Sequence, residues 1–281
     1  MGSKVRDSGD NSSMKAKKTA PVVPSVLDEP ERTSRGIQSV EVGGQLLKVL
    51  ALTGRAMALK DLARDAGMSP AKAHPYLVSF GKLGLIERDG LSGQYGLGPL
   101  AVQLGLISLQ QVDPVRLAIA ELPPLAVAVG CTVSAAVWGA TGPVIVRVEE
   151  GPNQVNVSMR HGMPASLRHT GTGKVFAAFA DPQSVARALA VQGLESVLRD
   201  PAFMAELADI RLSRISVVRD ELIAGISAMA VPVFDGFGRL VLAIAAMGPT
   251  SMMDLSIHGS QAQSLRDAGA RLSARLGAIG V

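Results

Sequence analysis

The stretch ALKDLARDAGMSPAKAHPYLVSF, residues Ala58 to Phe80, decides how the first part of this chain folds. Apolar residues recur in its first half at helical spacing, at Leu59, Leu62, Ala63 and Ala66. Gly67 ends that pattern, because glycine adopts the left-handed conformation that closes a helix at least cost. Ser69 and Pro70 begin a second helix, as a hydroxyl cap followed by a proline at the first helical position. The spacing fits any helical hairpin, but it is also typical of a helix-turn-helix, whose second helix can enter the DNA major groove.

The residues that follow favour the DNA-binding interpretation. Gly81–Arg88 reads as a short apolar strand, Asp89–Gly93 as a turn, and Gln94–Gly98 as a second short strand. This pattern predicts a β-hairpin. A helix-turn-helix followed by such a hairpin is a winged helix.

These segments together resemble the IclR family of bacterial transcription regulators. The matching residues are Ser39-Val40-Glu41, Leu62-Ala63 with Gly67-Met68-Ser69-Pro70, Lys72-Ala73-His74, Gly84-Leu85-Ile86-Glu87-Arg88 and Tyr95-Gly96-Leu97-Gly98. The resemblance implies that a double-stranded DNA operator is a partner of this chain.

Length and composition limit the remaining possibilities. The chain has 281 residues, of which 47% are hydrophobic, enough for two domains with buried cores. No apolar run reaches the roughly 18 residues that span a bilayer, and the N-terminus has no apolar signal core. The single cysteine, Cys131, excludes an intramolecular disulfide and fits a reducing cytoplasm. Four widely spaced histidines form no metal-ligand cluster, so we expect a cytoplasmic protein with no membrane contact, metal or cofactor.

The distribution of charge agrees with the motif. Residues 1–98 hold 14 Lys and Arg against 10 Asp and Glu, whereas residues 99–281 hold 14 of each. The whole net charge of +4 therefore lies in the part that carries the helix-turn-helix. Cations there can bind phosphates, although so small an excess predicts modest non-specific affinity.

The chain divides into four segments. Residues 1–35 are polar and proline-rich and read as a disordered tail, or as a basic arm that touches DNA. The winged helix occupies 36–98 and begins with a helix over Ser39–Leu52, which Gly43-Gly44 weakens. Residues 99–112 form a linker whose helix, Pro99–Gln111, contains no charge and therefore suits burial against a partner. Residues 113–281 form the second domain.

This second domain reads as α+β. A helical pattern over 114–129 is interrupted by Pro123-Pro124, so we expect a kink or two short helices there. Strand patterns cover 131–138, 144–148, 155–159, 226–234 and 239–247, and helical patterns cover 171–180, 183–191, 201–210 and 259–277.

The second domain also resembles the family's effector-binding domain, which has a GAF-like fold. The matching segments are Thr170–Lys174, Gly225, Ala230–Asp235 and Gly248-Pro249. The resemblance implies an effector site at Gly171, Thr172, Val218, Ala228, Ala245 and Met247. Most of these side chains are small or apolar, which leaves Arg168 and backbone donors to meet a carboxylate. We therefore expect a small organic acid with an apolar part, for instance an aromatic one.

Enzymatic motifs fail on inspection. Gly171-Thr172-Gly173-Lys174 lacks the glycine and the hydroxyl residue of a phosphate loop, because Arg168 and Val175 occupy those positions. A dinucleotide fingerprint would need glycine in place of Phe176. The turn instead opens a helix, with or without an anion at its backbone donors. His161 and His169 flank a loop and either line a pocket or face solvent. We expect no catalytic residue.

The second helix of the motif predicts the DNA contacts. On a helical wheel Ala73, Leu77 and Phe80 face the core, and the opposite side faces the groove. With the cap and the wing, this gives Ser69, Ala71, Lys72, His74, Pro75, Ser79 and Arg88 as the candidate DNA-binding residues. Pro75 is unusual, because the family usually has arginine there and proline removes a backbone donor from the helix.

Two functions remain. The first is a ligand-responsive regulator, repressor or activator, of a catabolic operon, acting as a homodimer or homotetramer. The second is a small-molecule-binding protein whose winged helix, degenerate at Pro75, serves only for dimerisation.

Overall fold

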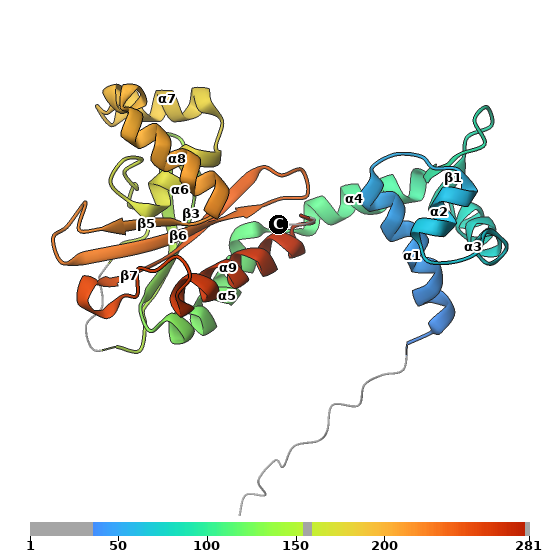
Figure 1. Cartoon of the computed structure of the whole chain (residues 1–281), viewed down its shortest axis with the longest axis horizontal. Helices are drawn as coiled ribbons and strands as arrows, with labels where there is room; N and C mark the ends of the chain where they lie inside the picture. The colour runs from blue at the N-terminus through green and yellow to red at the C-terminus, as the bar shows by residue number, and fades with distance from the viewer. Residues whose placement is uncertain (1–35, 154–158, 279–281) are drawn as a thin grey trace, which may run out of the picture.

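The computed structural model of the chain describes residues 36–153 and 159–278. The predicted tail, 1–35, and most of the strand predicted over 155–159 lie outside these ranges. Met159, the one residue of that run within them, is in no strand. Figure 1 shows a small N-terminal body and a larger α+β body joined by one helix.

The N-terminal body is a winged helix. It consists of α1 (Gln38–Thr53), α2 (Leu59–Asp65), α3 (Pro70–Leu83), β1 (Ile86–Arg88) and β2 (Tyr95–Leu97). The two strands pair antiparallel, with Glu87 opposite Gly96. Apolar side chains from all five elements and from the loop before α2 make its core, including Leu46, Leu50, Met57, Leu62, Ala73, Leu77, Ile86 and Tyr95.

The start of α3 is built as the sequence predicted, and its end is not. The Ser69 side chain accepts a hydrogen bond from the Lys72 N–H and so caps the helix. The strand expected from Gly81 begins only at Ile86, because α3 continues through Leu83. Gly84 then closes the helix with φ +75°, a conformation that favours glycine.

Helix α4 (Pro99–Gln111) joins the two bodies, with the bounds the sequence predicted. None of its residues is buried within the chain. Its exposed side chains include Val102, Leu104, Leu106, Ile107 and Leu109. An uncharged helix with this much exposed apolar surface is typical of an interaction site.

The C-terminal body is built on one antiparallel sheet. Its strands are β3 (Thr132–Gly139), β4 (Gly142–Glu149), β5 (Ser216–Arg219), β6 (Ile226–Phe234) and β7 (Leu240–Pro249). They lie in the order β4-β3-β7-β6-β5. The short edge strand β5 was not predicted, because its four residues are too few to show an alternating pattern.

Helices cover both faces of the sheet. On one face α5 (Pro114–Val129) and α9 (Ser260–Arg275) pack side by side against large aliphatic residues of the strands (Figure 1). The other face carries α6 (Gly171–Phe179), α7 (Pro182–Val191) and α8 (Pro201–Ser213). Short 3-10 turns occupy Glu195–Arg199 and Thr250–Met252. The α+β architecture predicted from the sequence is confirmed.

Helix α5 corrects one expectation. Two short helices were a possible result of Pro123-Pro124, but α5 is a single helix through both prolines. The prolines remove only the two N–H donors that would have bonded the carbonyls one turn earlier. Burial of Leu122, Leu125 and Val129 against the sheet and α9 offsets that loss.

Candidate functional site

The predicted DNA-facing side of α3 is exposed. Ala71, Lys72, His74, Pro75 and Ser79 are all accessible to solvent, and the cap residue Ser69 is too. On the opposite side Ala73 and Leu77 are buried in the core. The helical wheel therefore predicted correctly which side of α3 packs on the core of its own domain. The opposite side is exposed and is available to a DNA groove.

Pro75 lies inside α3, one turn before Ser79. The Ser79 hydroxyl donates a hydrogen bond of 3.0 Å to the Pro75 carbonyl oxygen. This bond occupies the Ser79 donor within the helix. Ser79 must therefore give up or share this bond before it can donate to a phosphate oxygen, although its lone pairs can still accept a hydrogen bond.

The wing contributes Arg88, whose position is fixed. Its Nε donates to the Gly93 carbonyl oxygen at 3.1 Å, and its guanidinium lies 5.6 Å from the centre of the Tyr95 ring. At the tip, hydrogen bonds from the Ser92 hydroxyl and from backbone N–H groups lower the pKa of Asp89. The wing therefore carries a cation at its base and a carboxylate at its tip.

Two exposed lysines of α3 have no ion-pair partner among the described residues. Arg64, on α2, is bound to both Asp61 and Asp65. Lys72 and Lys82 lie near the two ends of α3 and form no ion pair with any described residue. Electrostatic attraction to DNA at this helix would thus rest largely on these two lysines, a modest number of phosphate contacts.

The second candidate site is a cavity of about 140 Å³ in the C-terminal body. It lies on the α6 side of the sheet, beneath the loop between β5 and β6. Its lining residues are Ile145, Met159, Met163, Pro164, Ala165, His169, Thr170, Gly171, Thr172, Val218, Leu222, Ile223, Ile226, Ser227, Ala228 and Met247. An apolar cavity of about 150 Å³ is large enough for benzene. This cavity therefore has room for one six-membered ring.

Five of the seven predicted effector residues line this cavity: Gly171, Thr172, Val218, Ala228 and Met247. Ala245 does not, because it lies deeper in the core beneath α6. Arg168 does not line it either, because its guanidinium turns toward two glutamates. His169 lines the cavity, whereas His161 accepts a hydrogen bond from the Val148 N–H at its Nε2.

The start of α6 supplies the polar part of the cavity wall. Thr170 caps the helix by accepting from the Gly173 N–H. The N–H groups of Gly171 and Thr172 donate to no oxygen of a described residue, and the Thr172 hydroxyl, in a residue only 4% exposed, has no partner there either. Helix N-terminal donors of this kind bind anions.

Gly173 allows this turn to pack closely. A Cβ at residue 173 would lie 1.9 Å from the Ser166 carbonyl oxygen, a distance that no side chain can occupy. A Cβ at Gly171 would instead meet Ala230 at 3.5 Å, an ordinary contact, and would point toward β6. Of the two glycines, Gly173 is therefore the one that packing requires.

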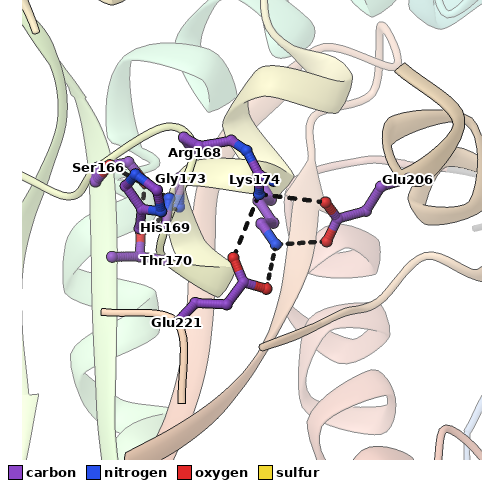
Figure 2. A network of polar contacts seen from close by, with 8 residues as sticks. All are labelled: Ser166, Arg168, His169, Thr170, Gly173, Lys174, Glu206 and Glu221. Carbon is purple, nitrogen blue, oxygen red and sulfur yellow. Dashed lines mark hydrogen bonds and ion pairs between the residues drawn. The ribbon is translucent and has the colours of Figure 1, made fainter. Parts of the chain in front are cut away.

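Four charged side chains form a network at α6, α8 and the loop after β5 (Figure 2). Lys174 of α6 is 0% exposed, and its Nζ lies 2.5 Å from Glu206 Oε1 and 2.6 Å from Glu221 Oε1. Arg168 Nη1 lies 3.3 Å from Glu221 Oε2 and 3.8 Å from Glu206 Oε2. Two cations and two carboxylates thus neutralise one another, and Arg168 is not available to a ligand in the cavity.

The network connects three separate elements. Glu206 belongs to α8, and Glu221 belongs to the loop 220–225, which also places Leu222 and Ile223 over the cavity. Asp220 fixes that loop, because its Oδ1 accepts from the Gly225 N–H and from the Thr250 hydroxyl. Sequence reasoning missed this network, since residues 32 and 47 positions apart from Lys174 show no common pattern.

The geometry defines a class of protein. A winged helix with an exposed second helix, joined to an α+β domain that encloses a small cavity, is the architecture of a ligand-binding transcriptional regulator. Residues 39–90 match the family model described as "IclR helix-turn-helix domain", and residues 108–274 match "Bacterial transcriptional regulator IclR C-terminal". The chain belongs to the IclR family of transcriptional regulators, as its sequence predicted.

Individual relatives agree over most of the chain. The glycerol operon regulatory protein of Streptomyces griseus is 30% identical over 256 residues, which cover 87% of this chain and 98% of that protein. The DNA-binding transcriptional repressor YiaJ of Escherichia coli K12 is 26% identical over 260 residues, with 90% and 92% covered. Both are regulators, which confirms that this chain is a regulator and not an enzyme.

A solved structure is also similar. The crystal structure of Pseudomonas aeruginosa HmgR superposes with a TM-score of 0.79 at 32% sequence identity, over 87% of this chain and 100% of that one. Within residues 36–153 and 159–278, no helix is long and apolar enough to cross a membrane. In the same ranges no group of acidic, histidine or cysteine side chains could hold a metal ion.

The charge network yields a prediction about stability. The double variant Glu206→Gln with Glu221→Gln leaves the buried Lys174 ammonium without a carboxylate, which costs about 3–5 kcal/mol. Lys174→Met leaves two carboxylates that are about one-third exposed and still next to Arg168, so we expect a smaller loss. Thermal unfolding should therefore give a lower midpoint for the double variant than for Lys174→Met. If Lys174→Met has the lower unfolding midpoint instead, burial of the ammonium does not determine how much the network contributes to stability.

Proposed function

We propose that the protein binds a double-stranded operator through α3 and the wing, and that a small organic acid in the cavity changes this binding. The cavity between α6, the 220–225 loop and the sheet carries the proposal. It combines unpaired backbone donors at Gly171 and Thr172 with apolar walls of one-ring size. A carboxylate fits the donors, and an aromatic ring fits the walls.

The acid group has no cationic side chain to bind. No lysine or arginine is among the residues that line the cavity, and Arg168 is neutralised by two glutamates. A carboxylate would bind the N-terminus of α6, the Thr172 hydroxyl and His169. The proposal extends to a catabolic operon, since the Streptomyces relative is named for control of a glycerol operon.

A second function is favoured by one observation. Pro75 lies on the exposed side of α3 and supplies no cation, which leaves only Lys72 and Lys82 near the two ends of the described helix. In this alternative, the winged helix serves only for dimerisation. The cavity still binds a small molecule, but the protein does not bind an operator. A gel shift with the DNA next to the protein's own coding region separates the two functions.

Filling the cavity with a larger side chain tests the effector proposal. Ala228→Leu places a larger side chain into the cavity, so a monocyclic acid such as benzoate should no longer change operator binding. The operator affinity without acid should stay within about twofold, because residue 228 belongs to β6, which lies in the other body from α3 (Figure 1). Gel shifts with and without benzoate measure both effects.

The matched control is Ala224→Leu, the same substitution at an exposed position of the 220–225 loop. It should respond to benzoate like the parent. An Ala228→Leu protein that also responds like the parent would rule out this cavity as the effector site.

Pro75→Arg tests the DNA interface. An interior helix proline costs about 3 kcal/mol, and a bidentate arginine–guanine pair is worth about 1–3 kcal/mol. We expect the variant to be more stable and to bind the operator about tenfold to a hundredfold more tightly. Pro75→Ala should gain the stability without the affinity. If Pro75→Arg binds DNA no better than the parent at matched salt, position 75 does not face the groove.

Assembly through α4 is a further prediction. Its exposed apolar residues suit a symmetric dimer, and a tetramer could form through further contacts of the C-terminal bodies. Sedimentation at micromolar concentration should show a dimer or tetramer, and Leu106→Glu should shift it toward monomer. Leu91→Glu, at a wing residue that is 100% exposed, should leave assembly unchanged. A monomeric parent protein would contradict the prediction.

A further inference from the structure

Three buried hydroxyl groups have no hydrogen-bond partner among the described residues: Thr132 Oγ1, Ser134 Oγ and Ser216 Oγ. Each of these residues is at most 1% exposed. Native proteins satisfy nearly all buried polar groups, so such groups call for an explanation. The three lie in strands β3 and β5 of the central sheet.

Strand register places all three on the cavity side of the sheet. Thr132 pairs with Met247, Met247 with Ala228, and Ala228 with Val218. Directly paired residues project from the same face, and three members of this row line the cavity. The next row runs from Val148 on β4 through Ser134, Ala245 and Ala230 to Ser216 on β5.

The cavity spans the strand that carries Thr132 and Ser134. It is lined by Ile145 on β4 and by Met247 on β7, and β3 lies between these two strands. Ser216 is placed differently, on the edge strand β5, where α6 packs over the neighbouring Ala230. Neither Thr132 nor Ser134 lines the cavity itself, but Thr132 lies one strand away, directly beside the lining residue Met247.

Methionine side chains border this region. Met159, Met163 and Met247 line the cavity, and Met247 is the direct neighbour of Thr132 across the strands. A methionine side chain is unbranched and changes rotamer readily. A ligand that moves the Met247 thioether would uncover the Thr132 hydroxyl without moving the backbone.

We propose that Thr132 and Ser134 form a polar subsite of the cavity that binds a hydroxyl group of the ligand. The subsite would make the effector a hydroxylated monocyclic aromatic acid, with its carboxylate at the start of α6 and its ring hydroxyl at β3. This inference rests on the proposed function of the cavity as an effector site.

The test compares benzoate with 3-hydroxybenzoate and 4-hydroxybenzoate by isothermal titration calorimetry. The parent protein should bind at least one hydroxylated acid about tenfold more tightly than benzoate, because one added hydrogen bond to a buried group is worth about that factor. Thr132→Val with Ser134→Ala should reduce the preference to within about twofold and leave benzoate binding unchanged. Ser216→Ala is the control, because it removes a similar hydroxyl and should keep the preference.

Thermal unfolding of the ligand-free protein gives a second readout. Removal of an unpartnered buried hydroxyl relieves its desolvation cost, so Thr132→Val should raise the midpoint by about 2–4 °C. An unchanged or lower midpoint would show that the hydroxyl already has a permanent partner, such as a fixed water, and would overturn the subsite.

The binding results separate the two proposals. Equal binding of benzoate and both hydroxybenzoates by the parent would overturn the subsite but leave the effector cavity intact. Binding of none of the three acids would overturn both.

Discussion

The buried ammonium group of Lys174 is the constraint on which the cavity beside α6 depends. A buried cation without a partner of opposite charge is costly, and the chain supplies two carboxylates, from α8 and from the 220–225 loop. Lys174 lies one helical turn after the cap residue Thr170, so the contacts that neutralise it also hold the start of α6 (Figure 2). The cavity lies between these same elements. Charge pairing therefore holds α6 and the 220–225 loop on one side of the cavity, and the sheet forms its other side.

The sheet separates two kinds of packing. Toward α5 and α9 its strands present large side chains, such as Met229, Val231 and Ile244, which fill the space under both helices. Toward α6 the alternate positions are small, as at Ala230 and Ala245, so that the glycine turn can approach the strands closely. Small residues on one side of the sheet thus create both the close fit of α6 and the empty volume beside it. A core of uniform side chains would have given neither.

Local patterns predicted most of the fold, and long-range contacts escaped prediction. The cap at Ser69, the uncharged run of α4 and the helices α6 to α9 follow from capping and periodicity, which act within a few residues. The prolines of α5 left a kink or two short helices as alternatives, and the two short helices did not form because tertiary burial outweighed the local cost. Resemblance to the family supplied five of the sixteen residues that line the cavity, and it gave no reason to expect that Arg168 is paired with glutamates. The lysine network joins residues that are far apart in sequence, and the hydroxyls of β3 without a described partner depend on strand register. Neither kind of relation can be recognised in a single sequence.

Any coupling between the proposed effector cavity and DNA would have to pass along helix α4. In the part of the chain that the structure describes, each of the three hydrophobic cores lies wholly on one side of this helix, so no core is shared by the two bodies. Its 13 residues span about 20 Å at 1.5 Å per residue. A tilt of about 10° at one end would displace the other end by about 3.5 Å, close to the roughly 3.4 Å between successive base pairs. A lever of this length can turn a slight rotation of the effector body into a misalignment of one base pair at the operator.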